Sequence, residues 1–366
     1  MHSDWIEKYA RLLVGYCCDV KPGQRVLIRS TYLAQDLILA CQRCVLKVGA
    51  TCEFDISIPG LQRQSLEYSS DQALKTVPIL YETAVRQFDV MISIHAPFDI
   101  FSLKGVDESK LAISKDALKS VKSVWFDRGK TGNLRWVICN YPTQSLADVA
   151  QMRLDEYAQF IAQACFLTTP DPAKEWRRLS DKQQTYVDCL NQGSTIRFVA
   201  PHVDITFGVH KRRWINSDGK RNMPSGEVFT SPIESSANGT IQFDHPSLLF
   251  GEVIQGLKMT LKDGKVVQWE SETGHALLAR LFKIPGADYV GEIAIGTNDG
   301  IQVPTLNTLF DEKIGGTIHM AVGASYPETG GKNKSSIHHD FVTSFKTDSY
   351  IMLDDHVIYK NGCFVV

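Results

Sequence analysis

The first half of the chain alternates between stretches with a helical spacing of apolar residues and short runs that are almost continuously apolar. The helical spacing predicts helices over residues 4–18, 33–48, 70–87 and 144–191. The short apolar runs predict strands over residues 25–29, 52–56, 89–94, 121–126 and 135–139. Strands and helices that alternate in this way are typical of a layered α/β domain.

The pattern changes near residue 194, where apolar and polar residues begin to alternate one by one. This alternation predicts antiparallel strands, separated by turn residues. These strands are predicted over residues 195–199, 203–209, 239–244, 251–261, 264–270, 290–296 and 349–360. The sequence therefore predicts an α/β N-terminal domain over residues 1–193 and a β-rich α+β C-terminal domain over residues 194–366.

Composition places the chain among globular proteins and excludes some classes of binding partner. Of 366 residues 43% are apolar, and 39 Lys and Arg stand against 41 Asp and Glu, which gives a net charge of −2. A balanced charge removes the broad attraction expected of a general nucleic-acid binder. No apolar run approaches the ~18 residues that span a bilayer, and the N-terminus lacks a basic and hydrophobic leader. We therefore expect a cytoplasmic protein that binds neither nucleic acid nor membrane.

The nine cysteines favour the same location. They are scattered and odd in number, which indicates buried thiols in a reducing compartment rather than a disulfide framework. Cys41 and Cys44 form a Cys-x-x-Cys, but no second pair follows at zinc-site spacing, and both fall in a predicted helix. We interpret this pair as structural.

Candidate metal ligands gather in the second half of the chain. His338 and Asp340 are two residues apart in an extended segment, so their side chains would share one face, while His339 would point the other way. Glu227 and Glu292 are each followed directly by apolar, strand-like residues, which indicates partly buried carboxylates. A buried carboxylate needs a metal or a basic partner, and an ion pair is the simpler alternative for each glutamate alone.

Several longer motifs extend this set to a recognisable pattern. They are Asn222–Thr230, Gly291–Ala294, Asn307–His319, Tyr326–Glu328 with Ile337–Asp340, and the N-terminal segment Lys21–Ile28. In this order they resemble the M29 metallo-aminopeptidases, also called the aminopeptidase T or thermophilic aminopeptidase family. The resemblance spans nearly the whole chain.

The resemblance implies a two-domain homodimer that holds two divalent metal ions in its C-terminal domain and releases N-terminal amino acids from peptides with a free N-terminus. The metal ligands of the family fall on Glu227, Glu292, His319, Tyr326, His338 and Asp340. Tyr326 is also a candidate catalytic residue. Glu312 occupies a glutamate position near the first histidine of the family and is carried over as a candidate acid/base.

This ligand set suits peptide hydrolysis. Water bound to a divalent ion can reach a pKa near ~7 instead of 15.7, and two ions can share a hydroxide and polarise the scissile carbonyl. Because the set contains no thiolate, zinc, cobalt, manganese and magnesium all remain candidates. A carboxylate would take the proton of the water and pass it to the leaving amine.

A second activity remains open on the same motifs. They also resemble mononuclear non-haem Fe(II) dioxygenases that open dihydroxypyridine rings with a ligand set of two histidines and one carboxylate. In that branch a histidine stands at the position of Glu292, so Glu292 together with Glu227 favours the hydrolase. His95 and His202, which adjoin predicted strands, would favour a redox enzyme, but lone histidines are more often structural.

Overall fold

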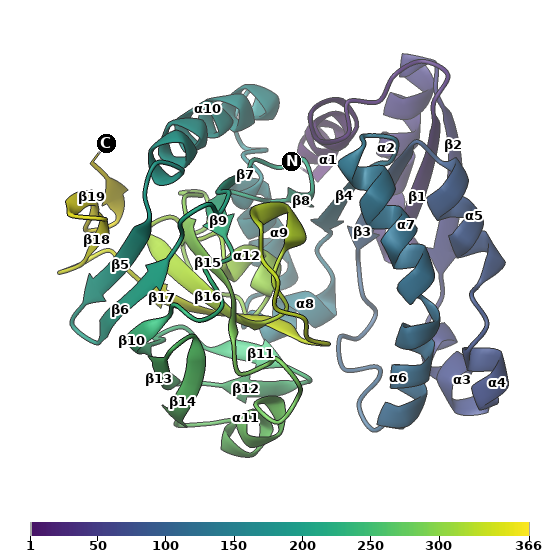
Figure 1. Ribbon diagram of the computed structural model, residues 1–366. Coiled ribbons are helices and arrows are strands. Elements are labelled where there is room, and N and C mark those ends of the chain that lie inside the picture. The colour runs from purple at the N-terminus through teal and green to yellow at the C-terminus, as the bar shows by residue number, and fades with distance from the viewer. Residues whose placement is uncertain (1, 366) are drawn as a thin grey trace. The chain divides into compact units, whose positions relative to one another are not determined.

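A computed structural model describes residues 2–365, which form two compact units (Figure 1). The first unit contains the chain up to Ala173 and the return segment Gly219–Pro224, and the second contains Lys174–Asp218 and the described chain from Ser225. Helix α10 (Pro172–Leu190), which the sequence analysis places before residue 194, packs largely with the second unit. Tyr186, Val187 and Leu190 of this helix belong to the buried hydrophobic cluster of the second unit. The amide of the buried Gln183 also donates to the carbonyl oxygens of Ser217 and Glu227. The boundary at 193/194 stays a prediction.

The first unit is built on a parallel sheet in the order β2-β1-β3-β4-β8. Its strands are β1 (Arg25–Thr31), β2 (Thr51–Ser57), β3 (Val90–His95), β4 (Arg135–Asn140) and β8 (Asn222–Met223). Its helices are α1 (His2–Arg11), extended by a π-helix (Leu12–Cys17), α2 (Gln35–Val48), α3 (Leu61–Tyr68), α4 (Asp71–Leu74), α5 (Ile79–Gln87), α6 (Glu108–Ala117), α7 (Lys119–Lys130), α8 (Gln144–Val149) and α9 (Leu154–Ala164). This arrangement confirms the predicted α/β architecture.

Helices cover the parallel sheet and explain its apolar strands. Leu27 of β1 and Met91 of β3 pack in one cluster with Val85 of α5 and Val121 of α7. Cys41 is fully buried on α2, and its burial raises the pKa of the thiol, in agreement with a structural role for the Cys-x-x-Cys. Parallel strands of this kind are buried by the helices that connect them.

The predicted strand over residues 121–126 is wrong, because this segment belongs to helix α7. Its β-branched and aromatic residues favour a strand by composition. However, Val121, Val124 and Trp125 are spaced three and four residues apart and contact the same hydrophobic cluster, while Phe126 is exposed. Spacing of this kind is helical, and it outweighs the intrinsic preference of the residues.

The second unit contains antiparallel sheets, as the alternating pattern predicts. An eight-stranded sheet has the order β14-β13-β10-β6-β5-β18-β19-β20, a five-stranded sheet has the order β17-β16-β15-β9-β7, and β11 pairs with β12. The strands are β5 (Thr195–Ala200), β6 (Val203–Gly208), β7 (Ile215–Ser217), β9 (Glu227–Thr230), β10 (Asn238–Gln242), β11 (Ser247–Leu249), β12 (Glu252–Ile254), β13 (Lys258–Lys262), β14 (Lys265–Glu270), β15 (Val290–Gly296), β16 (Thr317–Gly323), β17 (His338–Ser344), β18 (Tyr350–Leu353), β19 (His356–Lys360) and β20 (Cys363–Phe364). Two short helices complete the unit, α11 (His275–Leu281) and α12 (Thr308–Asp311).

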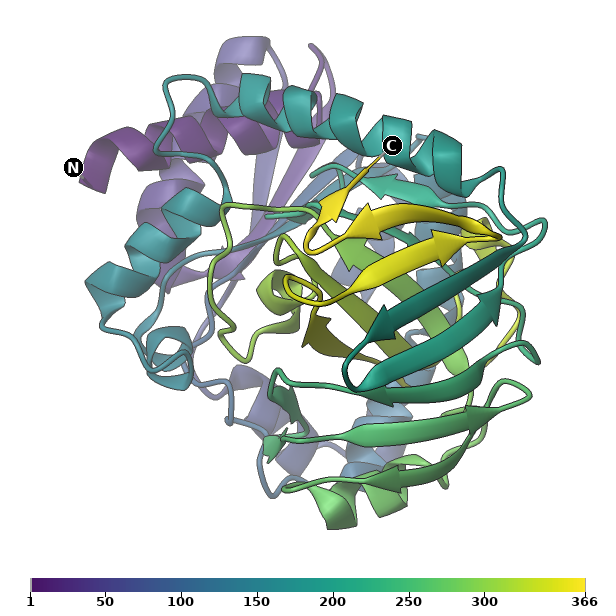
Figure 2. The same ribbon diagram turned by 90° about the vertical axis from the view of Figure 1, so that its left-hand side faces the viewer.

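The core of the second unit lies between its two large sheets. Phe198 and Phe207 of the eight-stranded sheet belong to the same buried cluster as Ile295, Met320 and Phe341 of the five-stranded sheet. Figure 2 shows the eight-stranded sheet facing the viewer, with α10 running past the strands nearest the C-terminus of the chain, which are drawn in yellow. The five-stranded sheet therefore buries one face in the core, and its other face is available for polar side chains.

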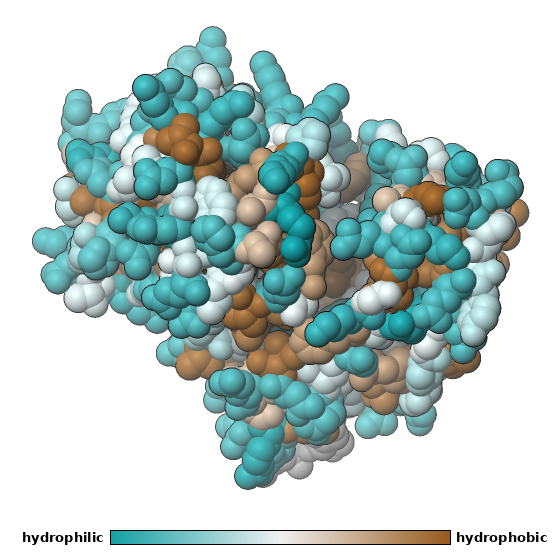
Figure 3. Space-filling view, turned by 90° about the horizontal axis from the view of Figure 1, so that it is seen from below, coloured by the Kyte–Doolittle hydropathy of each residue, from teal (hydrophilic) through white to brown (hydrophobic). Residues whose placement is uncertain are grey.

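The surface carries both polar and apolar residues. Tyr68, Ile79 and Leu80 are among the large apolar side chains that are exposed. On the face drawn in Figure 3, hydrophobic residues lie scattered among hydrophilic ones, which is normal for a globular protein. Within residues 2–365, no helix has the length and apolar character that crossing a membrane requires.

Candidate metal centre

Five of the six predicted metal ligands lie on the five-stranded sheet. Glu227 begins β9, Glu292 is on β15, His319 is on β16, and His338 and Asp340 are both on β17. Successive residues of a strand point to opposite faces, so the apolar residues next to Glu227, Glu292 and His319 along their strands point into the core. Strand pairing thus brings together segments that lie far apart in the chain.

The register of the sheet leaves room for the ligands. On β16, Ala321 pairs with Glu292 on one side and with Asp340 on the other. Gly323, two residues further along β16, pairs with His338. These small residues on the middle strand leave the space above it to the longer side chains of its neighbours.

Backbone carbonyl groups orient both histidines. The Nδ1 atom of His319 is 2.9 Å from the carbonyl oxygen of Glu312, and the Nδ1 atom of His338 is 2.7 Å from that of Ala324. A carbonyl oxygen can only accept, so each Nδ1 carries the proton. Each Nε2 atom is thereby directed to the carboxylates, which is how metal-binding histidines are usually held.

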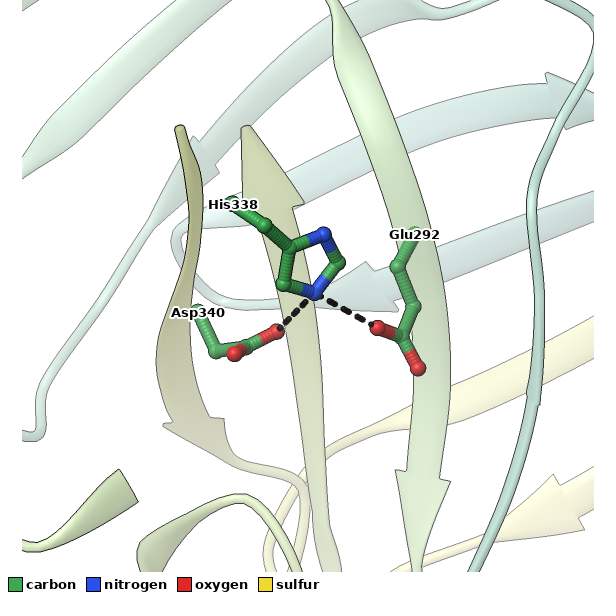
Figure 4. Close-up of side chains that lie close together, drawn as sticks. All are labelled: Glu292, His338 and Asp340. Carbon is green, nitrogen blue, oxygen red and sulfur yellow. Dashed lines mark ion pairs between the residues drawn. The ribbon is translucent and has the colours of Figure 1, made fainter. Parts of the chain in front are cut away.

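The two Nε2 atoms share two carboxylates. Oε1 of Glu292 lies 3.7 Å from Nε2 of His319, and Oε2 of Glu292 lies 3.1 Å from Nε2 of His338. Oδ1 of Asp340 lies 3.9 Å from Nε2 of His319 and 3.6 Å from Nε2 of His338. Figure 4 shows the imidazole of His338 between Glu292 and Asp340. A carboxylate with one oxygen toward each imidazole can serve two neighbouring cations.

We name two half-sites by these imidazoles. The inner half-site comprises His319, Glu227 and Glu312, and the outer half-site comprises His338 and Tyr326; Glu292 and Asp340 belong to both. Oε2 of Glu227 lies 3.7 Å from Nε2 of His319. Ligand atoms of Glu312, His319 and Asp340 lie within 4.8 Å of one another, and so do those of Glu292, His338 and Asp340.

These residues fit a divalent metal. Among the described residues, Oε2 of Glu227 and Oδ1 of Asp340 are fully buried side-chain oxygens without a hydrogen-bond partner. A buried carboxylate oxygen without a donor is costly. Both oxygens lie near an imidazole Nε2 atom, and a cation bound between them would satisfy the oxygens and the nitrogen together.

The charges of the cluster are unbalanced. Glu227, Glu292, Glu312 and Asp340 bring four carboxylates together, and within the described chain one permanently charged cation, Lys313, is ion-paired with them. Nζ of Lys313 lies 3.3 Å from Oε1 of Glu227 and also contacts Glu312. The excess of negative charge makes the cluster an attractive site for cations.

The histidine pKa values respond to this excess. Burial acts to lower the pKa of His319, but the carboxylates of Glu292, Glu227 and Asp340 outweigh it and raise the pKa to about 9. The pKa of His338 rises to about 10, because Asp340 and Glu292 outweigh its burial. Without a metal, the imidazoles thus supply part of the missing positive charge.

The carboxyl pKa values diverge. Burial raises the pKa of Asp340 to about 6 and raises that of Glu227 above its ordinary range. Glu292 is also buried, but its contacts with His319 and His338 outweigh burial and lower its pKa to about 2. The glutamate between the two imidazoles is therefore the carboxylate held most firmly in its charged form.

Tyr326 lies beside the outer imidazole, and Glu312 lies beside the inner one. The hydroxyl oxygen of Tyr326 is 3.4 Å from Nε2 of His338, and burial raises the pKa of this phenol well above its ordinary value. Glu312 follows α12 and lies beside His319. Its side chain is 13% exposed, whereas those of Glu227, Glu292 and Asp340 are each 6% exposed.

Sequence reasoning missed Lys313, which is completely buried. It follows Asp311 and Glu312, and such a polar run is more often a solvated turn, so the sequence carries no signal of its burial. The two histidines that the sequence analysis considered for a redox enzyme, His95 and His202, lie outside the ligand groups found among the described residues. His95 ends β3 in the first unit, and His202 lies between β5 and β6; both are exposed.

Comparison with known proteins points to a family of metalloproteases. The family model of the thermophilic metalloproteases (M29) matches residues 2–364. The chain belongs to the M29 family. Aminopeptidase 2 of Geobacillus stearothermophilus is 28% identical over 92% of this chain and 91% of its own, and aminopeptidase PepS of Streptococcus thermophilus is 26% identical over 92% and 91%. The solved structure of wild-type AmpT from Thermus thermophilus has this fold, with a TM-score of 0.85 and 22% identity over the whole of both chains.

These findings confirm the predicted family and fold. As an M29 protein the chain is a metallopeptidase and therefore a hydrolase. The related M29 proteins are named as aminopeptidases, in agreement with the predicted activity. The dioxygenase receives no support from these relatives, and Glu292 occupies the position where that activity implies a histidine.

Proposed function

We propose that this M29 protein is a metal-dependent aminopeptidase that releases N-terminal amino acids from peptides with a free N-terminus. The family and the names of its relatives support this activity. The observation that carries the proposal is the position of Glu292, which presents one oxygen to His319 and the other to His338. This arrangement suits two ions better than one.

The proposal assigns one divalent ion to each half-site. Glu227 and His319 would hold the inner ion, His338 and Tyr326 the outer ion, and Glu292 and Asp340 both. Zinc, cobalt, manganese and magnesium are the candidate ions, since the donors are oxygen and imidazole nitrogen. When bound, such ions act as Lewis acids that lower the pKa of water toward ~7 and polarise a carbonyl group.

Glu312 is the proposed proton acceptor. It is the most exposed of the four carboxylates, so a proton can reach and leave it. It would take a proton from the attacking water and donate it to the leaving amine, as a general acid/base does. One of its oxygens contacts Lys313, which leaves the other for this transfer.

Tyr326 is proposed to act from the outer half-site. The raised pKa keeps its phenol neutral, so the hydroxyl can donate a hydrogen bond. From its place beside His338, it would stabilise negative charge that develops on the carbonyl oxygen of the substrate.

The proposal also covers the oligomeric state, the location and the substrates of the enzyme. We expect a homodimer, because the family resemblance implies one, and a cytoplasmic location with peptides as substrates. Light scattering tests the oligomeric state, since a mass near twice that of the 40.9 kDa chain is expected. A monomeric mass at all protein concentrations would contradict this part of the proposal.

The decisive experiment uses amino-acid p-nitroanilides and their N-acetylated forms. Protein whose metal has been removed by a chelator should be inactive. Zinc, cobalt, manganese or magnesium should restore activity toward the substrates with a free amine, but not toward the N-acetylated ones. Glu292→Gln should remain inactive, whereas Glu270→Gln, a change on an exposed strand, should behave as the wild type. Full activity after stripping, equal cleavage of acetylated substrates, or silence with every ion would contradict the proposed function.

A further inference from the structure

Lys313 is a buried cation inside the metal cluster, and the predicted ligand set gives it no role. Its side chain has no exposed surface, and its ammonium group contacts Glu227 and Glu312. The main chain holds it in place, because its N–H donates to Phe310 and its carbonyl accepts from Asn298. The backbone and the two carboxylates together fix the position of the Lys313 ammonium group.

The ammonium group competes with a metal for one carboxylate. Glu312 lies within ligand range of His319 and Asp340, so by distance alone it could coordinate the inner ion. However, Oε1 of Glu312 is already bound to the ammonium of Lys313. Lys313 also contacts Oε1 of Glu227. What distinguishes Glu227 is its Oε2 atom, which is buried without a hydrogen-bond partner and lies 3.7 Å from Nε2 of His319.

We infer that Lys313 is a positioning residue that keeps Glu312 out of the coordination sphere of the inner ion and so reserves it for proton transfer. This inference rests on the proposed function. It explains why a site with four carboxylates contains a lysine: the cation divides them into metal ligands and one proton acceptor. It also limits the affinity of the inner ion, because a nearby ammonium group repels a divalent cation.

The inference predicts the sign of a change in metal affinity. Replacing Lys313 by methionine removes the repulsion and frees Glu312 to coordinate, so the inner ion should bind more tightly. A divalent ion and an ammonium group a few ångströms apart repel each other enough to change affinity by about tenfold or more, even at the dielectric constant of water. A merely structural lysine would have the opposite effect, since disordered ligands weaken metal binding, typically by about 10–100-fold.

The test is a double-mutant cycle on metal-stripped protein, titrated with Mn²⁺ or Co²⁺ in a calorimeter. K313M should tighten one of two binding events about tenfold or more and lower kcat, and the absorption spectrum of bound Co²⁺ should change. E312Q alone should lower kcat and leave both binding events close to wild type. The double variant E312Q/K313M should lose the part of the tightening that the freed carboxylate provides and keep the part that comes from the removed repulsion.

Two controls accompany the cycle. K313R keeps the charge and should keep both affinities near wild type, and K258M removes a lysine from an exposed ion pair with Glu270 and should change nothing. If K313M does not fold, the single variant E312Q still tests the inference. Loss of a bound ion in E312Q would mean that Glu312 is a metal ligand and would overturn the inference. Weaker or unchanged binding in K313M would also overturn the inference.

These outcomes separate the inference from the proposed function. Wild-type protein that binds two ions and cleaves p-nitroanilides, while E312Q loses an ion, overturns the role of Lys313 alone. Wild-type protein that binds no divalent ion overturns both.

Discussion

The inner and outer half-sites are built from the same kinds of ligand, but they differ in how open they are. The side chain of His319 is 1% exposed, whereas that of His338 is 23% exposed. The inner imidazole has the buried Lys313 near its carboxylates, and the outer one has Tyr326. The comparison shows that the neighbours of a ligand, rather than its chemical type, decide whether solvent and substrate can reach it.

Position in the sheet explains the difference. His319 lies in the middle of β16, which is paired on both sides, by β15 and β17. His338 is the first residue of β17, which is the edge strand of the five-stranded sheet. An edge position at the start of a strand leaves an open side that a central position lacks.

Replacing His319 by alanine should have the largest effect. The imidazole is enclosed, and its loss would leave Oε2 of Glu227 without the nitrogen beside it and Oδ1 of Asp340 with His338 alone. We expect kcat/KM to fall by about a thousandfold or more, which corresponds to ~4 kcal/mol of transition-state stabilisation. Steady-state kinetics with metal analysis measures this. Activity within tenfold of wild type would contradict a role for the inner half-site.

Replacing His338 by alanine should cost less, about a hundredfold in kcat/KM, because water can enter the open outer position. The same openness predicts that added imidazole restores part of the activity of His338→Ala and none of that of His319→Ala. The comparison is made at equal metal saturation, with His356→Ala, a change of an exposed histidine, as the matched control. Equal rescue of both variants would show that the two half-sites do not differ in access.

Tyr326→Phe should have a smaller effect, about tenfold in kcat. The hydroxyl lies 3.4 Å from Nε2 of His338, and its loss removes one hydrogen-bond donor while the aromatic contact with Phe229 remains. Metal content and the thermal unfolding temperature check that the fold is kept. An unchanged kcat would remove Tyr326 from the reaction, and complete loss of the outer ion would show that its role as a ligand outweighs its role as a hydrogen-bond donor.

The pH dependence of stability should differ between stripped and metal-loaded protein. In the stripped protein the pKa values of His319 and His338 are raised to about 9 and about 10, so the folded state binds their protons more tightly than the unfolded chain. This stabilisation is fully present below the ordinary histidine pKa of ~6.5 and is lost as the pH rises through the raised values. The Tm of stripped protein should therefore fall by about 5 °C or more between pH ~7 and ~10.

Bound metal should remove most of this fall, because it replaces the protons on the imidazoles. Thermal unfolding with and without chelator measures the difference, and His338→Ala should show a smaller fall than the wild type in stripped form. An equal pH dependence of the stripped and loaded forms would contradict the pKa values and the charge imbalance from which they arise.

The sequence alone determined the periodic features of this protein. Alternation along residues 338–340 predicts that His338 and Asp340 share a face, and the structure groups both with Glu292. Apolar residues after Glu227 and Glu292 predict buried carboxylates, and both are buried. The motifs also predicted the family. These inferences depend on local order in the chain, which the sequence contains directly.

The tertiary structure decided the rest. It made residues 119–130 a helix, set the register that places Glu292 between two imidazoles, and buried Lys313 among carboxylates. It also made one histidine central and the other an edge residue. The physical reason is that periodicity describes a single element, whereas register, edge position and the burial of a charge depend on contacts between residues far apart in the chain.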